Sequence, residues 1–251
     1  GTGTLVLTIN PSGGGGSSSG VLVGWDTTGL STSNTWASVT NNATTVNANL
    51  SMTTQLTRGT NITVSGSGAS NAIGGSGGWS TTASDNTGWV FAFRANAGYS
   101  VSVTNLTGFS RRSNTGPSTV IVDVSVNGGA YTNAGSFATT STSGGGGAFT
   151  LVLTNLASLQ NVPSGQIIKF RVSPSGTTGN WDLLNGSNAL LVNGTVTAPA
   201  SVPTLASGTL TSGLTNPYGS AATNLRSFTL TGTNLTGDVA LSASSGFEIS
   251  Q

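Results

Sequence analysis

The amino-acid sequence predicts an all-β protein: a jelly-roll-like β-sandwich followed by part of an immunoglobulin-like sandwich. The first observation behind this prediction is alternation. Between Thr119 and Val126, valines alternate with Ile121, Asp123 and Ser125, and a period of two places the valines on one face of a strand. The second observation is turn chemistry, because short strand-like runs are separated by Gly- and Asn-rich segments. Many short strands with such turns are typical of a sandwich or jelly roll.

The composition limits the classes of function. Charged residues make up 5% of the sequence, against about 25% in a typical domain, so Ser, Thr, Asn and Gly must keep the surface soluble. The net charge is +1, and the Arg111-Arg112 pair is too small a basic cluster for a nucleic-acid partner. Cys and His are absent, which argues against disulfides and thiolate metal sites. No apolar run approaches the ~18–20 residues of a membrane span. This pattern fits an extracellular or cell-surface bacterial protein.

Residues 1–20 are expected to form a leading strand and a linker. Gly1–Asn10 alternates in the manner of a strand. The apolar side chains that share its face are Leu5, Leu7 and Ile9. The Gly/Ser-rich composition of Ser12–Gly20 predicts a flexible linker. Since the strand has no hairpin partner close by in sequence, its backbone N–H and C=O groups must pair with a distant segment.

Residues 21–198 are expected to form the main, jelly-roll-like domain. The buried face should include Phe91, Phe93, Val122 and Val124. A short turn near Ala157–Asn161 is the nearest approach to a helix. The candidate strands are Val21–Trp25, Thr44–Leu50, Thr60–Val64, Trp89–Arg94, Tyr99–Thr104, Val120–Val126, Phe149–Thr154, Ile167–Val172 and Ala189–Val196.

Residues 199–251 are expected to form the partial immunoglobulin-like module. Two prolines in the stretch from Thr197 to Thr204 mark the boundary before it. An immunoglobulin-like sandwich needs about seven strands and ~100 residues, whereas this stretch offers about four strands, so it corresponds to the first half of such a domain. The four candidate strands are Thr204–Leu210, Ser227–Thr233, Asp238–Ser242 and Gly246–Ser250.

A resemblance rests on several segments of the chain. In the main domain they are GWDTTGL, LTRGTNITVSGS, VFAFRANAGYSVSVTNLTGFSRRSNTGPS, VDVSVNGG and TTGNWDLLNGSNALLVNGTV. With these segments the domain resembles the jelly-roll modules of large bacterial secreted and surface proteins. The tail SFTLTGTNLTGDVALSASSGFEIS is similar to the opening half of the immunoglobulin-like repeats that often follow such modules. The resemblance implies a fold and a setting but brings no catalytic motif, because these modules accompany many different enzymes and adhesins.

No catalytic residue, metal ligand or cofactor is expected. The six acidic residues are scattered along the chain, whereas a glycosidase needs two carboxylates ~5–9.5 Å apart. A serine triad would lack its base, because the chain has no His. The glycine runs at Gly13–Gly16 and Gly144–Gly147 lack the following Lys of a phosphate loop. Ser84–Thr87 offers too few oxygens for a calcium loop. We therefore expect a protein that is not an enzyme.

The aromatic residues allow two interpretations. Four of them could form a sugar-stacking platform beside Arg111 and Arg112. Those four are Trp79, Trp89, Tyr131 and Trp181. Alternatively, Trp25, Trp89 and Trp181 fill the sandwich core, since aromatic side chains bury ~150–250 Å² each. We favour the core interpretation, and we expect the arginine pair to lie in a solvated turn.

Glycosylation is a separate hypothesis. The triplet Asp26-Thr27-Thr28 resembles the O-glycosylation acceptor of some bacterial surface proteins, which makes Thr27 and Thr28 the candidate residues. The mass of the peptide that contains them tests this hypothesis, and an unmodified peptide removes it.

The function predicted from these features is structural. We expect a subunit of an extracellular filament, sheath or surface layer, with copies of itself as partners and glycans as a further option. The leading strand of one chain would complete the C-terminal module of the next by strand addition. Its side chains Leu5, Leu7 and Ile9 would enter a groove near Phe228, Leu230 and Phe247. The alternatives are a carbohydrate-binding or adhesive module, an accessory domain of a larger enzyme, and one period of a longer repeat protein.

Overall fold

The structure, a computed structural model, describes residues 6–8, 16–30, 40–63, 70–140, 146–184, 186–199, 204–208, 228–233 and 239–242. The chain divides into two compact units. Unit 1 combines Gly1–Gly15 with Pro199–Gln251, and unit 2 is Gly16–Ala198.

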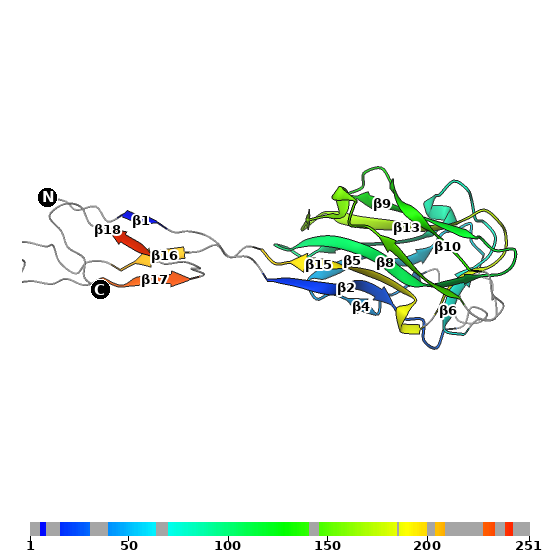
Figure 1. Ribbon diagram of the computed structural model, residues 1–251, viewed down its shortest axis with the longest axis horizontal. Helices are drawn as coiled ribbons and strands as arrows, with labels where there is room; N and C mark the ends of the chain where they lie inside the picture. The colour runs from blue at the N-terminus through cyan, green and yellow to red at the C-terminus, as the bar shows by residue number, and fades with distance from the viewer. Residues whose placement is uncertain are drawn as a thin grey trace, which may run out of the picture. The chain divides into compact units, whose positions relative to one another are not determined.

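Unit 2 contains two antiparallel sheets, which form the two layers in Figure 1. The first is six-stranded, in the order β10-β9-β13-β7-β5-β3. Its strands are β3 (Thr40–Asn41), β5 (Leu50–Arg58), β7 (Trp89–Ala95), β9 (Thr119–Val126), β10 (Thr132–Ala138) and β13 (Ile167–Ser175).

The second sheet follows the order β4-β2-β15-β8-β14-β6, with β11 and β12 also paired to β8. Its strands are β2 (Ser17–Trp25), β4 (Thr45–Val46), β6 (Ala72–Gly75), β8 (Ser100–Arg112), β11 (Gly147–Val152), β12 (Val162–Pro163), β14 (Trp181–Leu184) and β15 (Leu190–Thr197). Three single turns of 3₁₀-helix lie at Asp85–Thr87, Ala157–Leu159 and Gly186–Asn188.

Aromatic side chains join the two sheets into a sandwich. Trp25 of β2 lies 4.7 Å from Phe91 of β7, measured between ring centroids. At one margin, Phe137 of β10 stacks on Phe149 of β11 with centroids 3.8 Å apart. Because each contact crosses from one sheet to the other, the core lies between the layers, and the all-β sandwich class predicted from the sequence is confirmed.

The alternation of β9 works as predicted. Val120, Val122 and Val124 are buried in the core, and so are Phe91 and Phe93 of β7. The opposite face of the same sheet is also partly covered, because the carboxylate-bearing Asp123 is only 6% exposed. Burial on both faces of the sheet explains why every residue from Trp89 to Phe93 is apolar.

Two boundaries differ from the prediction. Ser17–Gly20, predicted as linker, forms the first part of β2 and pairs with Gly194–Thr197 of β15. These small residues carry no side-chain pattern, so only their tertiary partner makes them a strand. In the same way β8 continues to Arg112 instead of ending at Thr104. The strands that were not predicted within their observed bounds are β3, β5, β6, β10, β12 and β14. The predicted strand Thr60–Val64 is wrong over its described residues, because Thr60 and Asn61 form a turn and Thr63 makes only an isolated bridge to Ser76.

The chain enters and leaves unit 2 at the same end of the sandwich. Ser17 of β2 is the register partner of Thr197 of β15. One residue farther out, the backbone N–H of Ala198 donates to the carbonyl oxygen of Gly16 at 3.0 Å. The segments that flank unit 2 therefore start from adjacent points.

The described part of unit 1 contains two two-stranded sheets. In one, β16 (Thr204–Ser207) pairs antiparallel with β17 (Leu230–Thr233). In the other, β1 (Val6–Thr8) pairs antiparallel with β18 (Ala240–Ser242). The second sheet thus joins a strand that precedes unit 2 to a strand that follows it.

Candidate functional site

The candidate assembly site is the ladder between β1 and β18. Its register places Val6 opposite Ser242, Leu7 opposite Leu241 and Thr8 opposite Ala240. The leading strand therefore has the distant partner that its sequence requires. Strand addition of this type uses main-chain hydrogen bonds, so the pairing needs extended backbone on both sides more than it needs particular side chains.

The residues predicted for this site lie in several places. Leu7 is in β1, whereas Leu5, Ile9 and Phe247 lie outside the described residues. Phe228 and Leu230 are half-buried. Leu230 belongs to β17, whose register partners are in β16.

The strand opposite β1 is β18, which the prediction of the groove did not name. The sequence did contain a signal for β18, since Val239 and Leu241 alternate within a candidate strand. Sequence reasoning missed the pairing because it assigned the groove by hydrophobic size rather than by an open backbone edge.

The tryptophans do not form a sugar-stacking platform. Trp89 and Trp181 are fully buried, and Trp79 is 8% exposed. Trp79 packs edge-on against Trp181 and donates its indole N–H to the carbonyl oxygen of Gly179 at 2.7 Å. Trp25 is also buried. The core interpretation of Trp25, Trp89 and Trp181 is confirmed.

The arginine pair at the end of β8 was predicted as a solvated turn, and this prediction is wrong. The side chain of Arg111 is 11% exposed, and its Nε donates to Oδ2 of Asp182, whose side chain is fully buried, at 3.1 Å. Arg112 donates to four loop carbonyl oxygens and thereby ties them to the strand end; they belong to Thr139, Ser113, Asn114 and Gly116. A low-dielectric site demands such partners for a charge, so both arginines have a structural role.

A second charged cluster lies on the outer face of the six-stranded sheet. Asp85 accepts hydrogen bonds from Nζ of Lys169 at 2.6 Å and from the hydroxyl of Tyr131 at 2.8 Å. Arg171 donates to Oδ2 of Asp123 at 2.8 Å and lies over the Tyr131 ring, 3.8 Å from its centroid. The cluster therefore fastens the 3₁₀ turn at Asp85 onto β13 and β9.

Burial and pairing act in opposite directions on the pKa values of this cluster. Burial alone would raise the pKa of Asp85, but hydrogen bonds from Lys169 and Tyr131 and the nearby positive charges bring it below its ordinary value. Burial alone would lower the pKa of Lys169, but Asp85 and Tyr131 bring it above its ordinary value. Burial and the bond to Asp85 raise the pKa of Tyr131. At neutral pH, Asp85 is therefore ionised, Lys169 carries its positive charge and Tyr131 is neutral. None of the three is poised for acid–base catalysis.

The two threonines of the candidate glycosylation triplet differ in accessibility. Thr27 is 1% exposed, and its hydroxyl donates to the carbonyl oxygen of Asn71 at 2.6 Å. Thr28 is exposed; a hydrogen bond from its hydroxyl, and a second one from its backbone N–H to Oδ1 of Asp26, lower the pKa of that carboxyl. Attachment of a sugar thus remains a hypothesis, with Thr28 as the accessible hydroxyl.

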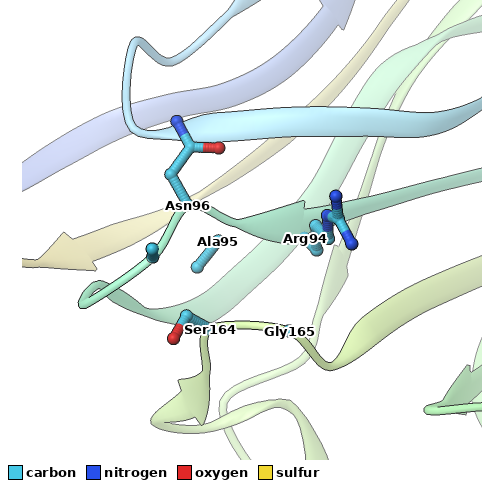
Figure 2. Close-up of a pocket in the computed structure, with 6 residues that line it drawn as sticks. Arg94, Ala95, Asn96, Ser164 and Gly165 are labelled. Atoms are coloured by element: carbon cyan, nitrogen blue, oxygen red, sulfur yellow. The ribbon is translucent and has the colours of Figure 1, made fainter.

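One open depression of about 330 Å³ lies beside the end of β7, lined by Arg94, Asn96, Ser164 and neighbouring small residues. Figure 2 shows the side chains of Asn96 and Ser164 pointing away from each other. Both amide atoms of Asn96 are engaged, one with Ala48 and one with Ser51. The polar groups do not converge on a common point, so the depression has no geometry for a catalytic or ligand-binding site.

The described residues contain no group of three or more acidic side chains that could hold a metal ion. Within the same residues, no helix has the length and apolar character needed to cross a membrane. No protein-family model matches the chain, and searches of curated proteins and of solved structures found no match either.

Proposed function

We propose that this protein is the structural subunit of an extracellular filament, sheath or surface layer, and that it has no enzymatic activity. Copies join head to tail when β1 of one chain adds to β18 of the next. The observation that carries this proposal is the β1–β18 ladder, whose two strands both belong to unit 1 and lie on either side of unit 2 in the sequence. A strand that pairs with a distant segment of its own chain can also be exchanged with the identical segment of another chain.

The topology of the contact supports growth without limit. Each chain offers one donor strand, β1, and one acceptor strand, β18. Donor and acceptor are different surfaces, so the contact is heterologous, and such contacts produce open filaments unless the rotation between copies closes a ring. The low charge of the chain, with a net charge of +1, limits the electrostatic repulsion between stacked copies.

The carbohydrate-binding alternative gains no support from the site. Its platform required accessible tryptophan rings, and Trp79, Trp89 and Trp181 are buried. Tyr131 is half-buried, and the guanidinium of Arg171 occupies one face of its ring. We therefore propose one function only.

Deletion of Gly1–Asn10 tests the proposal. The truncated chain lacks the donor strand, so it should remain monomeric in electron micrographs under conditions in which the full chain forms polymers. A synthetic peptide of sequence GTGTLVLTIN should bind the truncated chain and, in excess, should stop growth of the full chain. A peptide with Leu7→Pro is the control, because proline has no backbone N–H to donate to a ladder and is disfavoured within paired strands. Normal polymers from the truncated chain would contradict the proposal.

A further inference from the structure

The position of β1 within its own chain has a consequence for assembly. The ladder joins Val6–Thr8 to Ala240–Ser242 of the same chain. We propose that this pairing is a self-closing cap: in an isolated chain β1 occupies its own acceptor, and copies link only by exchanging it. This inference rests on the proposed function, because exchange requires that the same ladder also forms between chains.

The geometry of unit 2 makes closure within one chain easy. A domain placed between the two strands could hold them far apart, but the hydrogen bond from Ala198 to Gly16 brings its two ends together. Outside unit 2, the loop that β1 and β18 close consists of residues 9–15 and 199–239, and the entropic cost of closing a loop grows only slowly with its length. The termini of a domain often lie close together, which is why one domain can be inserted into another without disrupting it.

The balance between the closed and the exchanged state depends on concentration. The same three register pairs form in both states, so the free energy of the ladder cancels between them. What remains is the effective concentration of β1 near its own acceptor, for which the millimolar value of short flexible linkers is an upper limit, because effective concentration falls as a linker lengthens. At this limit, roughly one ladder in a hundred would be exchanged at about 10 μM protein, and half would be exchanged at about 1 mM, as on a crowded surface.

The cap would keep a dilute chain monomeric and would cover an edge that is otherwise prone to aggregation. An unpaired strand edge is a template for any other strand. Closure protects that edge until local concentration rises, so assembly occurs where chains accumulate. The partner that opens the cap is a second copy of this chain, and no other ligand is needed.

A disulfide across the ladder tests this inference. Leu7 and Leu241 are register partners, and directly opposed residues in antiparallel strands have Cα atoms about 4.5–5.5 Å apart, within the ~4.4–6.8 Å range of disulfides. The natural chain has no Cys, so the variant Leu7→Cys with Leu241→Cys has one defined pair. The control pairs Leu7→Cys with Leu230→Cys, because Leu230 pairs with Ser207 in the other sheet.

The expected result has two parts. Oxidation at about 10 μM should give a disulfide within one chain, seen as a monomer on non-reducing gels, and oxidation after incubation near 1 mM should give a ladder of linked chains. The monomer that was oxidised while dilute should fail to polymerise until a reductant is added. The control pair should give no comparable cross-link within the chain.

The outcomes separate the cap from the proposed function. Polymerisation of the disulfide-closed monomer at the normal rate would overturn the cap. Cross-links only between chains, even at the lowest concentration, would also overturn it and leave head-to-tail assembly intact. If the reduced variant and the natural chain form no polymer at any concentration, the proposed function fails, together with the exchange that depends on it.

Discussion

The two units of this chain differ in where their strand pairs come from. In unit 2, the strands from β2 to β15 pair with each other inside one continuous segment, Gly16–Ala198. In unit 1, the β1–β18 ladder joins segments from both sides of unit 2. A ladder between residues of one continuous segment belongs to that segment's fold, whereas a ladder between distant ends can be exchanged with another molecule. Under the proposed function, unit 2 is the stable body and unit 1 is the connection between copies.

The largest expected effect comes from the core of unit 2. Phe93 is fully buried and stacks near Phe170 with ring centroids 6.3 Å apart. Phe93→Ala should lower the free energy of unfolding of unit 2 by about 3–5 kcal/mol, because a buried cavity replaces the ring. Tryptophan fluorescence during urea unfolding measures this unit alone. All five tryptophans belong to it: Trp25, Trp36, Trp79, Trp89 and Trp181.

The control for Phe93→Ala is Val152→Ala. Val152 is 60% exposed, and exposed substitutions usually change stability by less than ~0.5 kcal/mol. A loss below ~1 kcal/mol for Phe93→Ala would place the ring outside a tightly packed core. That result would weaken the description of unit 2 as the stable body.

The next prediction compares two ion pairs of unit 2, Arg111–Asp182 and Lys169–Asp85. Asp182→Asn should lower the free energy of unfolding of unit 2 by about 3–5 kcal/mol, because it leaves the largely buried side chain of Arg111, which is 11% exposed, without its buried counter-charge. Asp85→Asn is the matched change at a carboxylate that is 41% exposed, where pairs contribute about 0–1 kcal/mol. Urea unfolding of the two variants measures the difference. Equal losses would show that burial does not decide the strength of these pairs.

The sequence predicted the parts of the fold that carry a side-chain pattern. The valines of β9 and the aromatic residues of β7 alternate or cluster, and both strands were predicted close to their observed bounds. In contrast, β6 reads Ala-Ile-Gly-Gly and is a strand because β14 lies beside it. Gly74 has no room for a side chain, since an added Cβ would collide with the carboxylate of Asp182. This close approach results from the tertiary pairing of β6 with β14, which no local pattern in β6 could predict.

The candidate site was only partly predictable for the same reason. An alternating strand without a neighbour required a distant partner, and that inference led to Leu7 and to the C-terminal module. The pairing of β1 with β18, while β17 pairs with β16, is set by tertiary structure that no local side-chain pattern encodes. Arg111 and Arg112 were misplaced because adjacent charges usually indicate solvent, whereas here buried Asp182 and loop carbonyls accept their hydrogen bonds.

A smaller effect is expected on unit 2 when the connection is removed. Deletion of Gly1–Asn10 takes away β1 but no strand of unit 2. The urea midpoint reported by tryptophan fluorescence should therefore change by less than the equivalent of ~0.5 kcal/mol, even though polymers are lost. If the midpoint falls by several times that amount, the two units do not fold independently, and the division between body and connection is wrong.

The smallest effect is expected from pH and salt. The chain has no His, so no ordinary side chain changes its charge between pH 5 and 8. The folded-state pKa of Asp85 is lowered, so its contribution is complete above its ordinary pKa, about 3.9, and is lost as the pH falls through the folded value. The folded-state pKa of Lys169 is raised, so its contribution is complete below its ordinary pKa, about 10.4, and is lost as the pH rises through the folded value. Both transitions lie outside pH 5–8, and solvent screening of these partly exposed groups keeps their contributions to stability small.

Light scattering of polymers and the urea midpoint of unfolding should therefore be the same from pH 5 to 8 and from low to high salt. Dissociation of polymers in high salt would mean that charge pairs, rather than a backbone ladder, hold the copies together.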